Sequence, residues 1–235
     1  MAYSILQPQR TRSVRGVLFD MDGVILDTEK LYTRFWQEAG IACGYPMTRE
    51  HALGMRSLNR AAGEVRLKSW FGPELNYEQV RLKRCELMDA YIEEYGVEPK
   101  PGIRELLAYL QTHGIPAAIT TATPIDRVLR HLTPLGLEKS FAAIRTAQDV
   151  PLGKPAPDIY LAGAAALNLP PESCLALEDS PVGILAAHGA GCMDVMVPDQ
   201  DQPNEDTKSL LFGLADSLTD VIDLLESLRR NQEAR

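Results

Sequence analysis

Short runs of apolar residues recur along the chain and predict buried strands. The first run, residues 17–19, ends directly before an aspartate. Further runs of the same kind follow at residues 115–120, 141–144, 174–177 and 192–197. Apolar runs of this length are typical of strands whose two faces are both buried in a parallel sheet.

Between these runs, apolar residues recur at spacings of three and four, which predicts amphipathic helices. One such stripe lies within residues 103–110, another within 125–132 and a third within 218–228. For the second helix, Thr123 is expected as the N-cap and Pro124 as the first helical residue. Because strands and helices alternate, we expect an α/β fold with a Rossmann-like, doubly wound parallel sheet that helices cover on both faces.

One stretch interrupts this alternation. From Glu29 to Tyr95 the sequence has helical periodicity and no convincing strand. We therefore expect an all-helical cap domain at residues 29–96. It would be inserted into a Rossmann-like catalytic core that residues 1–28 and 97–235 form together.

Two aspartates stand at the end of the first strand, in the segment VLFDMDGVILDTE. Asp20 is expected at the carboxyl edge of the sheet, where doubly wound folds place their sites, and Gly23 allows a tight turn after Asp22. Charges about 4 Å apart repel by roughly 4 kcal/mol at an effective dielectric near 20, and a hard cation with oxygen ligands would offset that repulsion. The alternative is an ordinary strand-ending turn.

Later segments place further polar groups at strand ends. In LALEDSPVG a strand ends in Glu178 and Asp179, and Ser180 is expected to cap the next helix ahead of a proline. Lys154 lies between prolines in PLGKPAPDIY, which favours a positioned cation, and Thr121 ends the strand in AAITTATP. Each residue also has an ordinary explanation as a helix-terminal acid, a surface lysine or a strand former. Together they predict a site that holds phosphate.

Four segments resemble the motifs of the haloacid dehalogenase superfamily of phosphatases: DMDG, TTAT, GKPAPDIY and EDSPVG. They stand in the expected order and extend over nearly the whole chain. The helical insert after the first motif is similar to the small α-helical cap of the β-phosphoglucomutase-like branch. The segments DTEKLYTRFWQEAG and ALGMRS look like cap segments of that branch.

This resemblance implies a role for each matching residue. Asp20 would be the nucleophile that forms an aspartyl-phosphate, and Asp22 would protonate the leaving oxygen and later deprotonate water. The implied cofactor is Mg²⁺. Its implied ligands are Asp20, the backbone carbonyl of Asp22, and Asp179. Glu178 would either bind the ion directly or contact one of its ligands. The implied phosphate-binding groups are Thr121, Lys154 and the backbone N–H groups around Gly23 and Ala122.

The resemblance also implies the reaction, a Mg²⁺-dependent hydrolysis of small phosphomonoesters such as a sugar phosphate or a nucleotide. Asp22 argues against the dehalogenases and phosphonatases of the superfamily, which lack this second aspartate. A phosphomutase of the β-phosphoglucomutase type is the alternative, although Tyr32 stands where such mutases carry a histidine. An inactive binding protein would be expected to have lost one of the motif residues. In the cap, Arg56 is the candidate for substrate contact, with a solvated surface arginine as the alternative.

Composition limits the partners of this enzyme. The 235 residues carry a formal net charge of -8, which argues against binders of nucleic acid or membrane surfaces and leaves small phosphorylated metabolites. No apolar run approaches the roughly 18 residues of a membrane span. Residues 1–15 lack the apolar block of a signal peptide and are expected to be a short polar lead-in. The four scattered cysteines are expected to be buried free thiols in a reducing compartment, so we expect a cytoplasmic enzyme. We also expect it to be a monomer.

Overall fold

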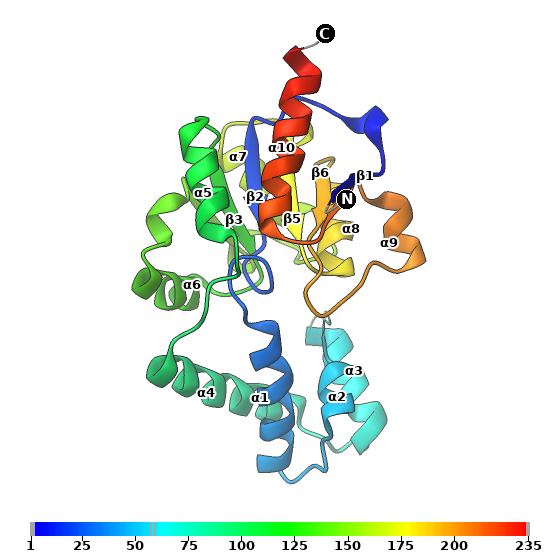
Figure 1. Ribbon diagram of the computed structural model, residues 1–235. Coiled ribbons are helices and arrows are strands. Elements are labelled where there is room, and N and C mark those ends of the chain that lie inside the picture. Colours follow the sequence, from blue (N-terminus) through cyan, green and yellow to red (C-terminus); the bar gives the residue numbers. More distant parts are fainter. Residues whose placement is uncertain (1–2, 57, 59, 234–235) are drawn as a thin grey trace. The chain divides into compact units, whose positions relative to one another are not determined.

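The computed structural model describes residues 3–56, 58 and 60–233 (Figure 1). The chain forms two compact units, Met1–Leu26 with Pro99–Arg235 and Asp27–Glu98. The domain boundaries expected from the sequence, after residues 28 and 96, each lie two residues from these limits. The assignment of residues 29–96 as a cap and of residues 1–28 and 97–235 as a catalytic core stays a prediction.

The larger unit is built on a seven-stranded sheet with the order β1-β7-β6-β5-β2-β3-β4. The strands expected from the apolar runs are all present and pair in parallel. They are β2 (Gly16–Phe19), β3 (Ala117–Thr121), β4 (Ala143–Thr146), β5 (Cys174–Glu178) and β6 (Met193–Met196). Every residue of β2, β3, β5 and β6 is buried, which explains why these strands read as continuous apolar runs. The expected fold class is confirmed.

The expectation of a polar lead-in at residues 1–15 was wrong. Strand β1 (Tyr3–Ile5) pairs antiparallel with β7 (Gly213–Ala215) at the edge of the sheet. The short helix after β1 ends at Arg10, whose guanidinium donates to the fully buried carboxylate of Asp194 at 2.6 Å. Strands of three residues carry no periodic signal, so this edge depends on tertiary contacts that the local sequence does not announce.

Helices cover both faces of the sheet. Figure 1 shows α5 (Ile103–Thr112) and α10 (Leu218–Glu233), which pack against each other, in front of the sheet, and α7 (Asp158–Ala166) behind it. Helix α8 (Pro181–Gly189) packs against α7 and against strands β5 and β6, and two shorter helices complete the unit. These are α6 (Ile125–Leu132) and α9 (Glu205–Leu210).

The starts of two helices bear on the site. Ser180 caps α8 by accepting a hydrogen bond from the Gly183 N–H at 3.1 Å, as expected. The expected N-cap of α6 was wrong: Pro124 occupies that position, and it makes no side-chain capping bond. Thr123 instead donates its hydroxyl proton to Asp22, at 2.8 Å. The hydroxyl that was expected to accept from a helix N–H thus acts as a donor to a carboxylate far away in the sequence.

The described residues of the smaller unit contain helices and no strand: α1 (Glu29–Ala42), α2 (Arg49–Leu53), α3 (Arg60–Phe71) and α4 (Tyr77–Tyr95). Helices α1 and α4 pack closely. At their interface the buried guanidinium of Arg84 stacks on the rings of Tyr32 and Trp36, 4.7 and 5.3 Å from the ring centroids. No helix among the described residues combines the length and the apolar composition that crossing a bilayer requires.

Candidate active site

The predicted acids and the predicted hydroxyl lie at the carboxyl ends of three neighbouring strands. Asp20 directly follows β2, and its backbone N–H donates to the Leu177 carbonyl of β5 at 2.9 Å. Thr121 is the last residue of β3, Glu178 is the last residue of β5, and Asp179 follows it. The chain continues from β2 to β3 on one side, while β5 pairs with β2 on the other. These residues therefore surround the topological switch point of the sheet, where doubly wound folds bind ligands.

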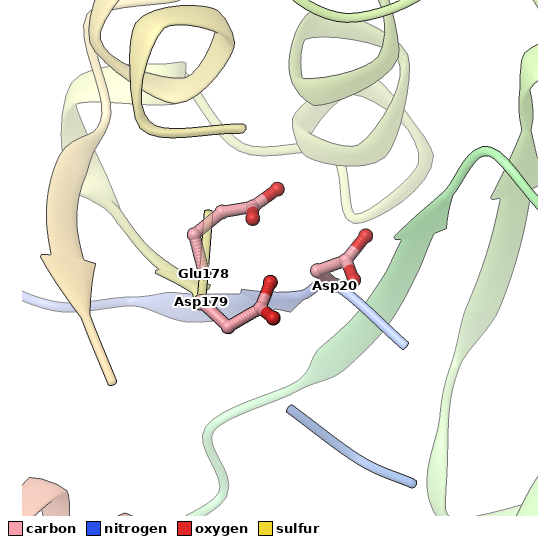
Figure 2. Close-up of side chains that lie close together, drawn as sticks. All are labelled: Asp20, Glu178 and Asp179. Atoms are coloured by element: carbon pink, nitrogen blue, oxygen red, sulfur yellow. The ribbon is translucent and has the colours of Figure 1, made fainter. Parts of the chain in front are cut away.

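Asp20, Glu178 and Asp179 form a cluster of carboxylates at this edge (Figure 2). One carboxylate oxygen from each residue lies within 4.8 Å of the other two. The three residues are buried, with exposed fractions of 8, 1 and 7%. Carboxylates buried side by side require nearby positive charge, and a donor set made only of oxygen atoms suits a hard divalent cation.

Two glycines leave space for the carboxylates of this cluster. A methyl group at position 23 would overlap the carboxylate of Asp179, and the backbone of Gly23 has a φ of +84°, which disfavours other residues. A methyl group at Gly183 would overlap the carboxylate of Glu178. The acids therefore lie in a tight cradle that is shaped for them, and the residues of the site fit a bound divalent metal.

Lys154 brings a cation into the cluster. Its Nζ donates to Asp20 Oδ1 and to Glu178 Oε1, each at 2.5 Å, and its side chain is 12% exposed. Burial alone would lower the pKa of this lysine, but the carboxylates of Asp20 and Glu178 raise its pKa overall. The ammonium therefore stays charged next to Asp20.

Asp20 has a perturbed pKa. Burial raises the pKa of Asp20 to about 8; the ammonium of Lys154 opposes this rise, while the charges of Glu178 and Asp22 add to it. A carboxylate that attacks another atom must be ionised, and burial works against the ionised form. A further cation beside Asp20 favours the ionised form, which agrees with the fit of the cluster to a metal.

The carboxylate of Asp22 has a different hydrogen-bond partner from the carboxylates of the acid cluster. Its Oδ2 accepts the hydroxyl proton of Thr123, and within the described residues its carboxylate is not part of the Asp20, Glu178 and Asp179 cluster. The two aspartates of the first motif are thus divided between two surroundings. A backbone contact from Asp22 to a metal stays a prediction.

The predicted phosphate-binding groups are at the same edge of the sheet. Thr121 is 1% exposed, and its Oγ1 accepts a hydrogen bond from the Thr123 N–H at 3.0 Å, while Ala122 is exposed. The N–H of Gly23 donates to the Leu26 carbonyl at 2.9 Å, so a contact with phosphate requires this bond to open. The roles of these groups stay predictions.

Tyr160 belongs to the site and was not expected from the sequence. Its side chain is completely buried on α7, and its hydroxyl donates to Glu178 Oε1 at 2.5 Å. Burial, and secondarily the negative charges of Glu178 and Asp20, raise the pKa of Tyr160 well above its usual value, so the hydroxyl remains a donor. Tyr160 lies six residues after Lys154 in the sequence, and this closeness was the one sign of a role in the site. Nothing in the sequence pattern distinguished it from an ordinary core tyrosine.

Arg56, the predicted substrate contact, lies in the smaller unit directly after α2. It is half-buried, and its Nε donates to the Leu53 carbonyl at 3.2 Å. Its role in substrate binding stays a prediction.

Comparison with known proteins identifies the family. The family model of the haloacid dehalogenase-like hydrolases matches residues 14–191. The chain belongs to this family. The matched range of this haloacid dehalogenase-like hydrolase contains the acid cluster, Lys154, Thr121 and Tyr160.

Its relatives include phosphatases that match along most of their length. Hexitol phosphatase B of Escherichia coli K12 is 29% identical over 214 residues, covering 89% of this chain and 95% of the phosphatase. The probable pseudouridine-5'-phosphatase of Drosophila melanogaster is 32% identical over 217 residues, covering 87% and 92%. The β-phosphoglucomutase of Clostridium difficile shares the fold, with a TM-score of 0.76 and 21% identity over 94% of this chain and all of that one. The putative β-phosphoglucomutase of Thermotoga maritima is 27% identical, with a TM-score of 0.72 over 91% of this chain and 99% of that one, so the resemblance to the β-phosphoglucomutase-like branch is confirmed.

Proposed function

We propose that this haloacid dehalogenase-like hydrolase is a Mg²⁺-dependent phosphatase that hydrolyses small phosphomonoesters through an aspartyl-phosphate on Asp20. The observation that carries the proposal is the position of the Lys154 ammonium, 2.5 Å from Asp20 Oδ1, beside a cluster of buried acids. The arrangement combines a nucleophile, a positioned cation and oxygen ligands for a metal. Phosphoryl transfer requires mainly positioning and charge neutralisation, which these groups provide.

In the first half-reaction a carboxylate oxygen of Asp20 attacks phosphorus, and the bond between phosphorus and the leaving oxygen breaks. Asp22, in its protonated form, gives its proton to that oxygen, and the alcohol departs. In the second half-reaction Asp22 accepts a proton from water, whose oxygen attacks the phosphorus of the aspartyl-phosphate. Inorganic phosphate leaves, and Asp20 and Asp22 return to their starting states.

Thr121 and Lys154 would hold the oxygens of the phosphoryl group during both half-reactions, with help from the Ala122 N–H. The side chains of Asp20, Asp179 and Glu178, with the backbone carbonyl of Asp22, would hold Mg²⁺. When bound, the cation neutralises negative charge on the phosphoryl oxygens. The cradle around Asp179 and Glu178 supports this assignment.

The names of these relatives support a substrate that is a sugar phosphate or a nucleoside monophosphate. We prefer hydrolysis to the mutase reaction, because both of these curated relatives are named as phosphatases. We also place the enzyme in the cytoplasm, acting on small metabolites, and the three buried free thiols of Cys85, Cys174 and Cys192 support a reducing compartment. Arg56 remains our candidate for a substrate contact from the cap.

Metal removal tests this function. We expect the purified protein to release p-nitrophenol from p-nitrophenyl phosphate in Mg²⁺, to lose essentially all turnover in excess EDTA, and to regain it when Mg²⁺ is restored. The diester bis(p-nitrophenyl) phosphate is the control and should not be cleaved. A panel of hexitol phosphates and nucleoside 5'-monophosphates then ranks substrates by kcat/KM. Turnover that persists in EDTA would contradict a metal-dependent mechanism.

Thr123→Val is expected to lower kcat about tenfold, because valine keeps the shape of threonine but removes the hydrogen bond that orients Asp22, and tenfold in rate corresponds to about 1.4 kcal/mol. KM should change little, since Asp22 acts on protons during the reaction. The matched control is Thr112→Val, which removes an exposed hydroxyl that donates to the Ala108 carbonyl of α5. Equal kcat values for the two variants would show that Thr123 does not orient Asp22.

A further inference from the structure

Tyr160 contacts both members of the Lys154–Glu178 ion pair with different parts of one side chain. Its hydroxyl donates to Glu178 Oε1 at 2.5 Å, the same oxygen that accepts from Lys154 Nζ at 2.5 Å. The Lys154 ammonium also lies 5.1 Å from the centroid of the Tyr160 ring. The tyrosine is completely buried. Its hydroxyl has a hydrogen-bond partner there, and one face of its ring lies against the ammonium.

Close packing on both sides fixes this arrangement. A methyl group at Gly163, on the same helix as Tyr160, would overlap the Thr120 side chain of β3, so α7 lies directly against the sheet. On the other side Ser180 Oγ donates to Glu178 Oε2 at 3.2 Å. Both oxygens of Glu178 are therefore engaged, Oε1 by two donors and Oε2 by one.

Taking the proposed phosphatase function as the basis, we propose that Tyr160 is a positioning residue that directs Lys154 toward Asp20 and the phosphoryl group. The hydroxyl of Tyr160 and the ammonium of Lys154 share the charge of one oxygen, so each holds it less strongly than it would alone. Glu178 therefore does not draw the ammonium away from Asp20. The ring prevents the ammonium from moving toward α7.

The expected effect falls on the transition state. Negative charge on the phosphoryl oxygens is stabilised by a cation that is already in place. Without the Tyr160 hydroxyl, Glu178 holds Lys154 more tightly and the ammonium stabilises that charge less well. Substrate binding depends also on the other groups of the site. The loss should therefore appear in kcat more than in KM.

Tyr160→Phe tests this role, with Tyr109→Phe as the matched control. Tyr109 also donates to a glutamate, Glu226 Oε1 at 2.7 Å, but on α5 and α10, away from the acid cluster. For Tyr160→Phe we expect kcat about tenfold lower, KM within about twofold, and a Tm close to that of the wild type, because phenylalanine fills the same volume. Tyr109→Phe should leave kcat and KM unchanged.

Equilibrium binding gives a readout that a purely structural role would not move. By calorimetry in Mg²⁺, Tyr160→Phe should bind orthovanadate, which mimics the five-coordinate phosphorus, about tenfold more weakly, and inorganic phosphate within about twofold of the wild type. Equal weakening of both anions would overturn the positioning role. A double-mutant cycle with Glu178→Gln should also reduce the kcat effect of Tyr160→Phe to less than about twofold, if the hydroxyl acts through Glu178.

These outcomes separate the inference from the function on which it rests. Wild-type protein without phosphatase turnover would overturn the proposed function and this inference with it. Normal wild-type turnover together with unchanged kcat and vanadate affinity in Tyr160→Phe would overturn the role of Tyr160 alone.

Discussion

Asp20→Asn is expected to reduce phosphomonoester turnover by about 10⁴-fold or more, because an amide oxygen of the same size is far too weak a nucleophile to attack phosphorus. The variant should nevertheless fold. Asparagine has the same shape, its side-chain oxygen can still accept from Lys154, and the ammonium keeps Glu178 as an ionic partner. Steady-state rates with p-nitrophenyl phosphate measure the loss, and thermal unfolding measures the retained fold.

The covalent intermediate gives a second measurement of the same change. Wild-type protein quenched in acid during turnover should carry one phosphoryl group on the peptide that contains Asp20, and Asp20→Asn should carry none. Asp126→Asn is the matched control, because Asp126 is exposed in the first turn of α6 and belongs to no described part of the site. Turnover in Asp20→Asn at the wild-type rate would remove Asp20 as the nucleophile.

The position of the site could be predicted because it depends on where strands end. The apolar runs before Asp20 and Glu178 are complete enough to locate the carboxyl edge of the sheet without knowledge of the packing. Parallel pairing of β2 with β5 then brings those ends together. The residue at which a strand ends can be predicted from the local sequence, and parallel pairing places several such residues at the same edge of the sheet.

The internal connections of the site could not be predicted in the same way. The bond from Tyr160 to Glu178 depends on the closeness of α7 to β3, which a single glycine allows. The bond from Thr123 to Asp22 joins two segments that are 101 residues apart. Both depend on side-chain directions that the hydrophobic pattern does not determine. The β1 edge strand was missed for a related reason, since its pairing with β7 joins the two ends of the chain.

Lys154→Met is expected to lower kcat about 10³-fold. It should also make the Tm of the protein depend more strongly on bound metal. The first effect follows from the loss of the cation that faces the phosphoryl group. The second follows from burial: removing one partner of a buried ion pair costs about 3–5 kcal/mol, because it leaves carboxylates without their counterion. In this site both Asp20 and Glu178 lose the same ammonium. Lys139→Met, at an exposed lysine, is the matched control and should behave like the wild type.

The stability effect of Lys154→Met should depend on the metal. In EDTA we expect its Tm to fall by on the order of 10 °C, since 1 kcal/mol corresponds to about 2–4 °C for a chain of this size. In Mg²⁺ much of that loss should be recovered, because a divalent cation replaces the missing charge beside Asp20 and Glu178. The rise in Tm on adding Mg²⁺ should therefore be larger in the variant than in the wild type. An equal rise in both proteins would mean that the ammonium and the metal do not neutralise the same carboxylates, and the assignment of the acid cluster as the metal site would fail.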